Sequence, residues 1–297
     1  MRRNVATIGF FDGVHRGHRY LIEQVREEAI QRHLHSMLVT FNEHPRQVLS
    51  CDYSPKLLST LSERKQLLLS SEIDSVKFLD FTEEMSRMSA RDFMLHILQE
   101  QLNVEVLVIG YDHRFGHDKC THEDYIRWGE ELGIKVVPAK ELEGEKISSS
   151  IIRKAIQKGD LPAANRMLGH PYQIEGLIIE GHQVGRQMGF PTANLLVDAC
   201  KILPPCAAYA VRATLPDGTK YNGMLNIGQR PTLQNGRDIS VEVHLFHYQG
   251  DLYGENIRLD LYRQLRTERT FLSLEALRTQ LEEDARMAED ILSATPL

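Results

Sequence analysis

Two histidines that could act together stand near the start of the chain. His15 and His18 are three residues apart, so on a helical turn their rings would share a face and could donate to one group. Gly13 and Gly17 would let the backbone approach a ligand closely. This arrangement suits negative charge that grows on a phosphate group under attack. A surface pair or half of a metal site has the same spacing, so the spacing alone leaves the role open.

A second polar cluster lies at the start of an expected helix. Ser148, Ser149 and Ser150 precede an apolar-periodic run, and Arg153 follows one turn further on. Serine hydroxyls, backbone N–H groups and a guanidinium can together hold an anion. The same serines would also serve as an ordinary helix N-cap. The residues by themselves allow both interpretations.

A third cluster combines a glycine-bearing loop with the start of a strand. The loop runs from Gly185 to Gly189, and Thr192 and Asn194 follow at a spacing that puts them on one side of an extended chain. Magnesium bound to ATP needs only one or two oxygen ligands from the protein, and these two side chains could supply them. The alternative is a β-turn followed by a buried strand.

Residues 241–245 alternate in polarity. Val241, Val243 and Leu245 would lie on one face of a strand, which leaves Glu242 and His244 on the other. By default this second face is exposed to solvent.

The elements that position these clusters differ between the two halves of the chain. From residue 5 to about residue 158, apolar runs alternate with amphipathic stretches. Strands are expected at 5–9, 36–41, 75–81, 104–110 and 134–138, and helices at 17–32, 62–71, 90–101 and 122–133. This alternation predicts a doubly wound, Rossmann-like α/β domain with a parallel sheet. The first strand-to-helix turn then lies at the carboxyl ends of the strands, where ligands bind.

The second half has a different texture. A helix is expected after the serines, and a short one follows with Asp160 as its N-cap and Gly169 as its stop. Strand-like segments then come close together, at 174–181, 192–198, 208–215, 220–228, 240–248 and 257–265. They predict a small antiparallel β-barrel. Leucines at helical spacing in 273–292 predict a terminal amphipathic helix against it. We place the domain boundary between residues 168 and 169.

Composition limits the partners. The 297 residues suffice for two domains, and a net charge of −6 disfavours a nucleic-acid partner. No apolar stretch is long enough for a signal peptide or a membrane span, so we expect a cytoplasmic protein without a membrane partner. The four cysteines form no C-x-x-C pair and predict free thiols rather than zinc sites or disulfides.

The two N-terminal clusters in combination resemble the HxGH nucleotidyltransferase superfamily. The matching motifs are G-x-F-D-G-x-H-x-G-H and, in the right order, I-S-S-S-x-x-R. The resemblance implies that His15, His18 and Arg153 stabilise the departing pyrophosphate. It also implies an ATP site built from Gly9, Phe10, Asp12, Gly13, Gly17, Ser148, Ser149 and Ser150.

Two further segments, 40–45 and 109–116, resemble the adenylyltransferase module of prokaryotic bifunctional FAD synthetases. The resemblance implies flavin contacts from Asn42 and Asp112. Glu43, His113 and Thr121 depart from the residues that the family usually has, which are proline, phenylalanine and glycine.

The C-terminal half resembles riboflavin kinases in the run G-R-x-x-G-F-P-T-A-N-L and in segment 226–232. The resemblance implies Mg²⁺ ligands at Thr192 and Asn194 and a general base at Glu242. It implies flavin contacts from Arg266 and Glu268. The implied nucleotide-binding residues are Gly185, Arg186, Gly189, Pro191 and Thr192. Ala207 and Ala208 stand where the family usually has Gly-Val.

These resemblances imply a bifunctional enzyme with domains at 1–168 and 169–297. It would phosphorylate riboflavin to FMN and then adenylylate FMN to FAD, with ATP and Mg²⁺ in both steps. One alternative retains only the kinase activity, because the departures fall in the flavin-side loops of the other domain. An alternative of another class is a flavin-binding or regulatory protein without turnover. The sequence leaves the oligomeric state open.

Overall fold

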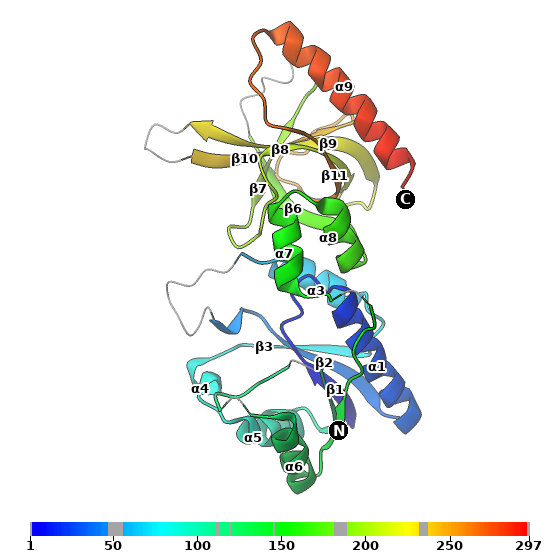
Figure 1. The fold of residues 1–297 in the computed structure, drawn as a ribbon, viewed down its shortest axis with the longest axis vertical. Helices are drawn as coiled ribbons and strands as arrows, with labels where there is room; N and C mark the ends of the chain where they lie inside the picture. The colour runs from blue at the N-terminus through cyan, green and yellow to red at the C-terminus, as the bar shows by residue number, and fades with distance from the viewer. Residues whose placement is uncertain are drawn as a thin grey trace. The chain divides into compact units, whose positions relative to one another are not determined.

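The computed structural model describes residues 2–46, 56–110, 113–118, 120–144, 146–180, 189–231 and 237–295. The chain forms two compact units (Figure 1). The first comprises Met1–Pro55 and Ser59–Ser148, and the second comprises Lys56–Leu58 and Ser149–Leu297.

The first unit is built on a parallel sheet of five strands. In chain order they are β1 (Asn4–Ile8), β2 (His35–Phe41), β3 (Ser75–Leu79), β4 (Val104–Ile109) and β5 (Lys135–Pro138). Their spatial order is β3-β2-β1-β4-β5. The chain runs outward in opposite directions from β1 and from β4, so the carboxyl ends of these two strands flank the topological switch point where ligands bind in such sheets.

Helices cover both faces of this sheet. Val5 and Val106 pack with Val25 and Ala29 of α1 (Arg16–Arg32), on the face that α3 (Leu61–Leu69) also covers. The other face carries α4 (Glu83–Ser86), α5 (Ala90–Asp92), the π-helix η1 (Phe93–Gln101) and α6 (His122–Leu132). Figure 1 shows α4, α5 and α6 on the side away from α1. The predicted doubly wound architecture is confirmed. The short helix α4 was not predicted, and the expected helix at 90–101 is mainly π-helical.

The second unit begins with two short helices, α7 (Ser149–Gln157) and α8 (Leu161–Leu168). Helix α8 starts and stops where its capping residues predict. Asp160 accepts a hydrogen bond from Ala163 N at 3.1 Å, and Gly169 ends the helix at φ 78°. Asn165 ties α8 to the barrel, because its side chain bonds both Tyr172 N and Leu261 O.

Six antiparallel strands close into a barrel in the order β10-β7-β6-β11-β8-β9. Their bounds are β6 Tyr172–Ile179, β7 Ala193–Val197, β8 Ala207–Thr214, β9 Lys220–Pro231, β10 Arg237–Leu245 and β11 Asn256–Thr267. Helix α9 (Leu274–Ser293) packs its buried Ala288 and Leu292 against the outer face of the barrel. The predicted barrel with a terminal helix is confirmed.

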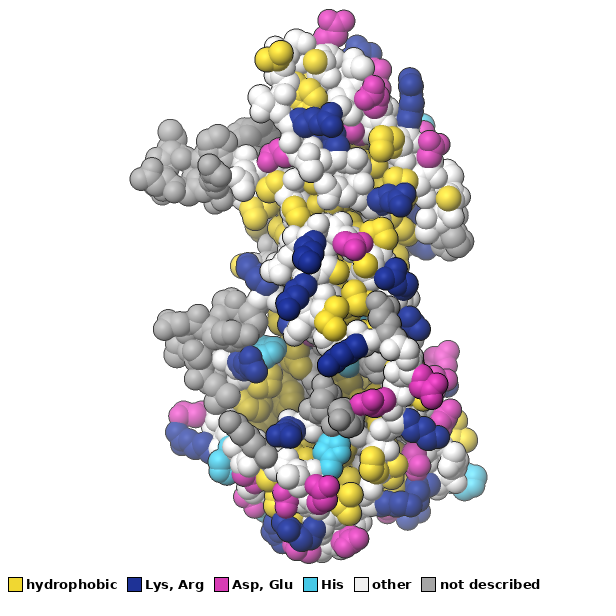
Figure 2. Space-filling view, viewed as in Figure 1, with side chains coloured by type: hydrophobic (Ala, Val, Ile, Leu, Met, Phe, Trp, Pro, Cys, Tyr) yellow, Lys and Arg dark blue, Asp and Glu magenta, His cyan; other side chains and the backbone are white. Residues whose placement is uncertain are grey.

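The helices, the surface charges and the cysteines bear on the predictions about membranes, partners and disulfides. Among the described residues, none of the helices is both long and apolar enough to cross a bilayer. In the view of Figure 2, acidic and basic side chains are interspersed over the surface of each unit. The described cysteines, Cys120, Cys200 and Cys206, are free thiols, as predicted.

Candidate active sites

The turn after β1 has an unusual backbone. Phe11, Gly13 and Val14 all adopt positive φ angles, of 55°, 77° and 40°. Such angles are costly for residues with a side chain and persist only where the surroundings hold them. Ser59 provides this support, because its N–H donates to Asp12 Oδ1 at 3.0 Å and its Oγ accepts from Gly13 N at 2.9 Å. Asp12 is thus buried as a brace of the turn.

The two histidines lie face to face at the start of α1. Their ring centroids are 3.6 Å apart and the ring planes are inclined by 15°. His15 is the N-cap, with Nδ1 accepting the N–H of His18 at 3.3 Å. Because Nδ1 accepts this bond, the proton of a neutral His15 ring lies on Nε2. A Cβ on Gly17 would lie 3.3 Å from the His15 ring, so a side chain at this position would crowd the histidine.

His18 is held in its neutral form. Burial holds its pKa well below the usual range, and the neighbouring His15 and His113 lower the pKa further. At pH 7 the ring therefore acts as a neutral hydrogen-bond donor, and additional positive charge is unfavourable until an anion binds.

The carboxyl ends of β2 and β3 hold a second group of polar contacts. Arg64 is buried and donates to the carbonyls of Phe41 and Asn42, at 2.6 and 3.0 Å, while its guanidinium lies 3.9 Å from the centroid of Phe10. The Asn42 amide donates to Asp80. Sequence reasoning singled out Phe10 and Asn42. It missed Arg64, because the run Ser-Glu-Arg-Lys is typical of an exposed helix.

The second N-terminal motif straddles the division between the units. Ser148 is the last residue of the first unit, and Ser149 opens α7 in the second. Ile152 is fully buried and fixes the rotation of the helix, which puts Ser149 and Arg153 one turn apart on a common face. Asp112 lies outside the described residues.

Five residues form one row across the barrel, and their order explains the C-terminal site. Asn194 pairs with Glu242, Glu242 with Asn226, Asn226 with Ala208, and Ala208 with Arg266. Directly opposed residues of antiparallel strands project to the same face. The row therefore aligns the predicted base, a predicted metal ligand and a predicted flavin contact.

This face is only partly exposed to solvent, because Glu242 and His244 are half-buried, contrary to the default expectation for these two residues. It lines a cavity of about 340 Å³ between the barrel and α9. Thr192 Oγ1 lies 3.5 Å from Glu242 Oε2, and Glu268 at the far end accepts from Gln229 N at 3.4 Å. Helix α9 and the segment before it contribute mainly apolar side chains, Phe271, Leu277 and Leu281.

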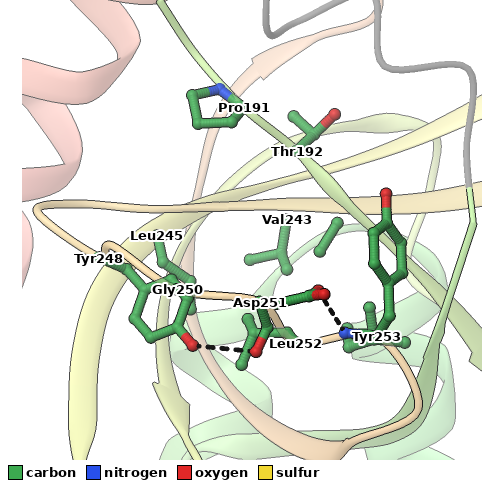
Figure 3. A pocket seen from close by; sticks show the side chains of 11 residues that line it. Pro191, Thr192, Val243, Leu245, Tyr248, Gly250, Asp251, Leu252 and Tyr253 are labelled. Carbon is green, nitrogen blue, oxygen red and sulfur yellow. Dashed lines mark hydrogen bonds between the residues drawn. The ribbon is translucent and has the colours of Figure 1, made fainter.

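Thr192 also lines a neighbouring cavity of about 560 Å³, together with Pro191 (Figure 3). Figure 3 shows Tyr248 and Tyr253 on either side of it, with Asp251 between them. Asp251 accepts from Tyr253 N at 3.0 Å and, through its carbonyl, from Tyr248 OH at 3.4 Å. Sequence reasoning did not assign these three residues, whose contacts depend on a loop closing on itself.

His244 holds the segment around Pro191, next to the Thr192 that lines both cavities. Burial lowers the pKa of His244, and its Nδ1–H donates to Pro191 O at 2.7 Å. Gly189 adopts a φ of 81°, with open space where a Cβ would stand. The predicted phosphate-loop residues Gly185 and Arg186 lie outside the described residues.

Comparison with known proteins matches both halves. Residues 1–151 match the family model described as FAD synthetase, and residues 168–292 match the one described as riboflavin kinase. The bifunctional riboflavin kinase/FMN adenylyltransferases of Pseudomonas fluorescens and Bacillus subtilis are each 35% identical to this chain. The match covers 96% of this chain in both cases, and 91% and 92% of the two relatives.

The fold of the chain also resembles that of a solved structure. A crystal structure described as a macrolide-efflux protein from Streptococcus pneumoniae has a TM-score of 0.87 at 30% identity. The match covers 98% of this chain and 95% of that one, so the two proteins share their fold along nearly their whole length.

The two matched domains define a transferase that acts on flavins and ATP. The chain belongs to the family of bifunctional riboflavin kinase/FMN adenylyltransferases. It forms FMN from riboflavin and FAD from FMN, as the sequence predicts.

Proposed function

We propose that each activity uses the site described in its own half of the chain. In the barrel, ATP occupies the cavity between Tyr248 and Tyr253, and riboflavin occupies the cavity beneath α9. The supporting observation is that Thr192 lines both cavities, so that the two substrates would meet beside it. Apolar and aromatic walls suit a nucleobase and a flavin ring, and the polar row suits the hydroxyl that reacts.

The kinase chemistry requires few protein groups. Glu242 accepts the proton of the riboflavin 5′-hydroxyl as this oxygen attacks the terminal phosphorus of ATP. Gly185, Arg186 and Gly189 bind the phosphates. Thr192 and Asn194 offer two oxygens beside this carboxylate, a donor set that fits Mg²⁺ on a nucleotide. When bound there, Mg²⁺ neutralises phosphate charge.

In the adenylyltransferase reaction, the FMN phosphate attacks the α-phosphorus of ATP and pyrophosphate departs. His15 and His18 donate N–H groups to the oxygens that gain charge, beside the N-terminal N–H groups of α1. Ser148, Ser149, Ser150 and Arg153 hold the departing pyrophosphate. Gly9, Phe10, Asp12, Gly13 and Gly17 form the nucleotide-binding turn, with flavin contacts from Asn42 and Asp112. No protein nucleophile is needed.

One assay tests the metal together with both activities. The purified protein is incubated with riboflavin and ATP, with Mg²⁺ or with EDTA, and the flavins are separated by chromatography. We expect FMN and FAD with Mg²⁺ and neither product with EDTA, because unscreened phosphate charge opposes both attacks. FMN formation at full rate in EDTA would refute the Mg²⁺ assignment. FMN alone with Mg²⁺ would indicate a kinase-only enzyme.

Ser59 offers a specific test of the N-terminal turn. The Ser59→Ala variant loses the acceptor for Gly13 N and one donor to Asp12, so the positive-φ turn relaxes. We expect kcat/KM for FAD synthesis to fall about fivefold, because loss of one such bond costs about 1 kcal/mol, while FMN formation is unchanged. Initial rates with FMN or riboflavin as substrate measure both effects.

A matched control is Ser70→Ala, since among the described residues the Ser70 hydroxyl bonds only Leu67 O, at the exposed end of α3. Equal losses in both variants would mean that Ser59 has no special role in the turn.

We also propose that the functional domains are residues 1–168 and 169–297 and that the protein acts in the cytoplasm, with riboflavin, FMN and ATP as its partners. The riboflavin kinase match begins at residue 168, which supports this boundary. The compact units divide earlier, between Ser148 and Ser149.

A further inference from the structure

Asp284 of α9 is a buried carboxylate that no sequence motif marks. Its side chain is 1% exposed and that of Arg266 is 11% exposed, and Arg266 Nε donates to Asp284 Oδ2 at 2.8 Å. A charge removed from water remains in a fold only when it is paired. The pair therefore restrains both side chains, and both line the cavity beneath α9.

Further bonds fix the orientation of the pair. Gln280 Nε2 donates to Asp284 Oδ1 at 3.0 Å, so each carboxylate oxygen has its own donor. Arg266 Nη1 donates to Thr267 O at 3.3 Å, and the guanidinium lies 5.4 Å from the centroid of Phe271. Within the described part of the chain, the hydrogen bonds of Arg266 use only Nε and Nη1. Nη2 is the donor that remains for a ligand in the cavity.

The row across the barrel indicates which part of the ligand this donor meets. Glu242 and Arg266 are three strands apart in the row, a path of ~14 Å along the curved barrel wall at the usual spacing of antiparallel strands. Riboflavin, a three-ring system with a five-carbon side chain, is of comparable length. With its terminal hydroxyl at Glu242, its ring system extends to Arg266, where ring carbonyls can accept an N–H.

We propose that Asp284 is a positioning residue of the riboflavin kinase reaction. Its carboxylate orients the Arg266 guanidinium so that Nη2 donates to the flavin ring, and this contact sets the affinity for riboflavin. The inference rests on the proposed assignment of the cavity beneath α9 to riboflavin.

A purely structural role is the alternative, since Asp284 also fastens α9 to the barrel. The structure offers a matched control for that role. Arg212 is buried and anchors the end of the same helix, donating to Leu292 O at 3.0 Å and to Thr295 O at 3.2 Å. Arg212 does not line the cavity, so loosening the helix there should not alter the binding of riboflavin.

The test is the KM for riboflavin of the full-length Asp284→Asn enzyme at saturating Mg-ATP. We expect a rise of about tenfold or more, the effect of one charge-assisted hydrogen bond. The kcat should change less than threefold, and the KM for ATP should stay constant. Conversion of added FMN to FAD by the same preparation reports the amount of folded protein. Arg212→Lys should lower the unfolding temperature without raising the KM for riboflavin.

A double-mutant cycle shows whether Asp284 acts through Arg266. Arg266→Gln should raise the KM for riboflavin, and adding Asp284→Asn to it should raise the KM less than twofold further. If Asp284→Asn reduces folding too far to measure, Asp284→Glu keeps the buried charge but displaces it by one methylene. It should also raise the KM.

The outcomes separate this inference from the site assignment. An unchanged KM in Arg266→Gln would reject the placement of riboflavin in this cavity. A raised KM in Arg266→Gln with an unchanged KM in Asp284→Asn and Asp284→Glu would reject only the positioning role. Independent, multiplicative effects in the double variant, or a raised KM in Arg212→Lys, would also overturn it.

Discussion

Replacing Glu242 by glutamine is expected to abolish FMN formation while the conversion of added FMN to FAD continues. Glutamine keeps the shape of the side chain but cannot accept the proton of the riboflavin hydroxyl. Positioned general bases typically contribute about 10²- to 10⁴-fold, so kcat for the kinase step should fall by at least ~100-fold. Steady-state rates with riboflavin and with FMN as separate substrates measure the two activities.

Glu289→Gln is the appropriate control, because Glu289 is an exposed carboxylate on α9 whose neighbour is His247. It should leave both rates unchanged. If Glu242→Gln retained most of its kinase activity, Glu242 would not be the base, and the polar row would serve binding alone.

The His18→Ala variant should show the reverse pattern, with loss of FAD synthesis and normal FMN formation. His18 stacks on the buried His15, and its lowered pKa keeps it a neutral donor at pH 7. Removing one donor to developing charge typically costs about 10²- to 10³-fold in kcat. Pyrophosphate release with FMN as substrate measures the loss.

His96→Ala controls for the removal of a histidine, since His96 lies on η1 with its side chain 51% exposed and bonds only Glu100 among the described contacts. Loss of FMN formation in His18→Ala, with FAD synthesis intact, would reverse the assignment of the two reactions to the two halves.

Features that depend on neighbouring residues could be predicted from the sequence, whereas features that depend on contacts between distant segments could not. Asp160 and Gly169 mark the ends of α8 because a cap depends on residues three or four positions away. Alternation likewise predicted that Glu242 and His244 share a face. It could not predict that α9 covers this face, because covering depends on packing between segments about 40 residues apart.

The residues that sequence reasoning missed also depend on contacts between segments that are distant in the sequence. Ser59 acts on Asp12 and Gly13 from 47 and 46 positions away, respectively. Asp284 lies in a helix rich in acidic residues, where a carboxylate is ordinarily exposed, and only the fold brings Arg266 to it. The fold class was predictable from periodicity, whereas the braces of both sites, Ser59 and Asp284, depend on tertiary contacts.

The closed barrel has one further consequence. Every strand in it is hydrogen-bonded on both sides, so β10 cannot slip by one residue unless two ladders break together. A slip of one residue would turn Glu242 inward and Val243 outward. The alignment of the row is therefore kept or lost as a whole. Natural variants that weaken the barrel should reduce how many molecules are active, while each active molecule keeps its preference for riboflavin.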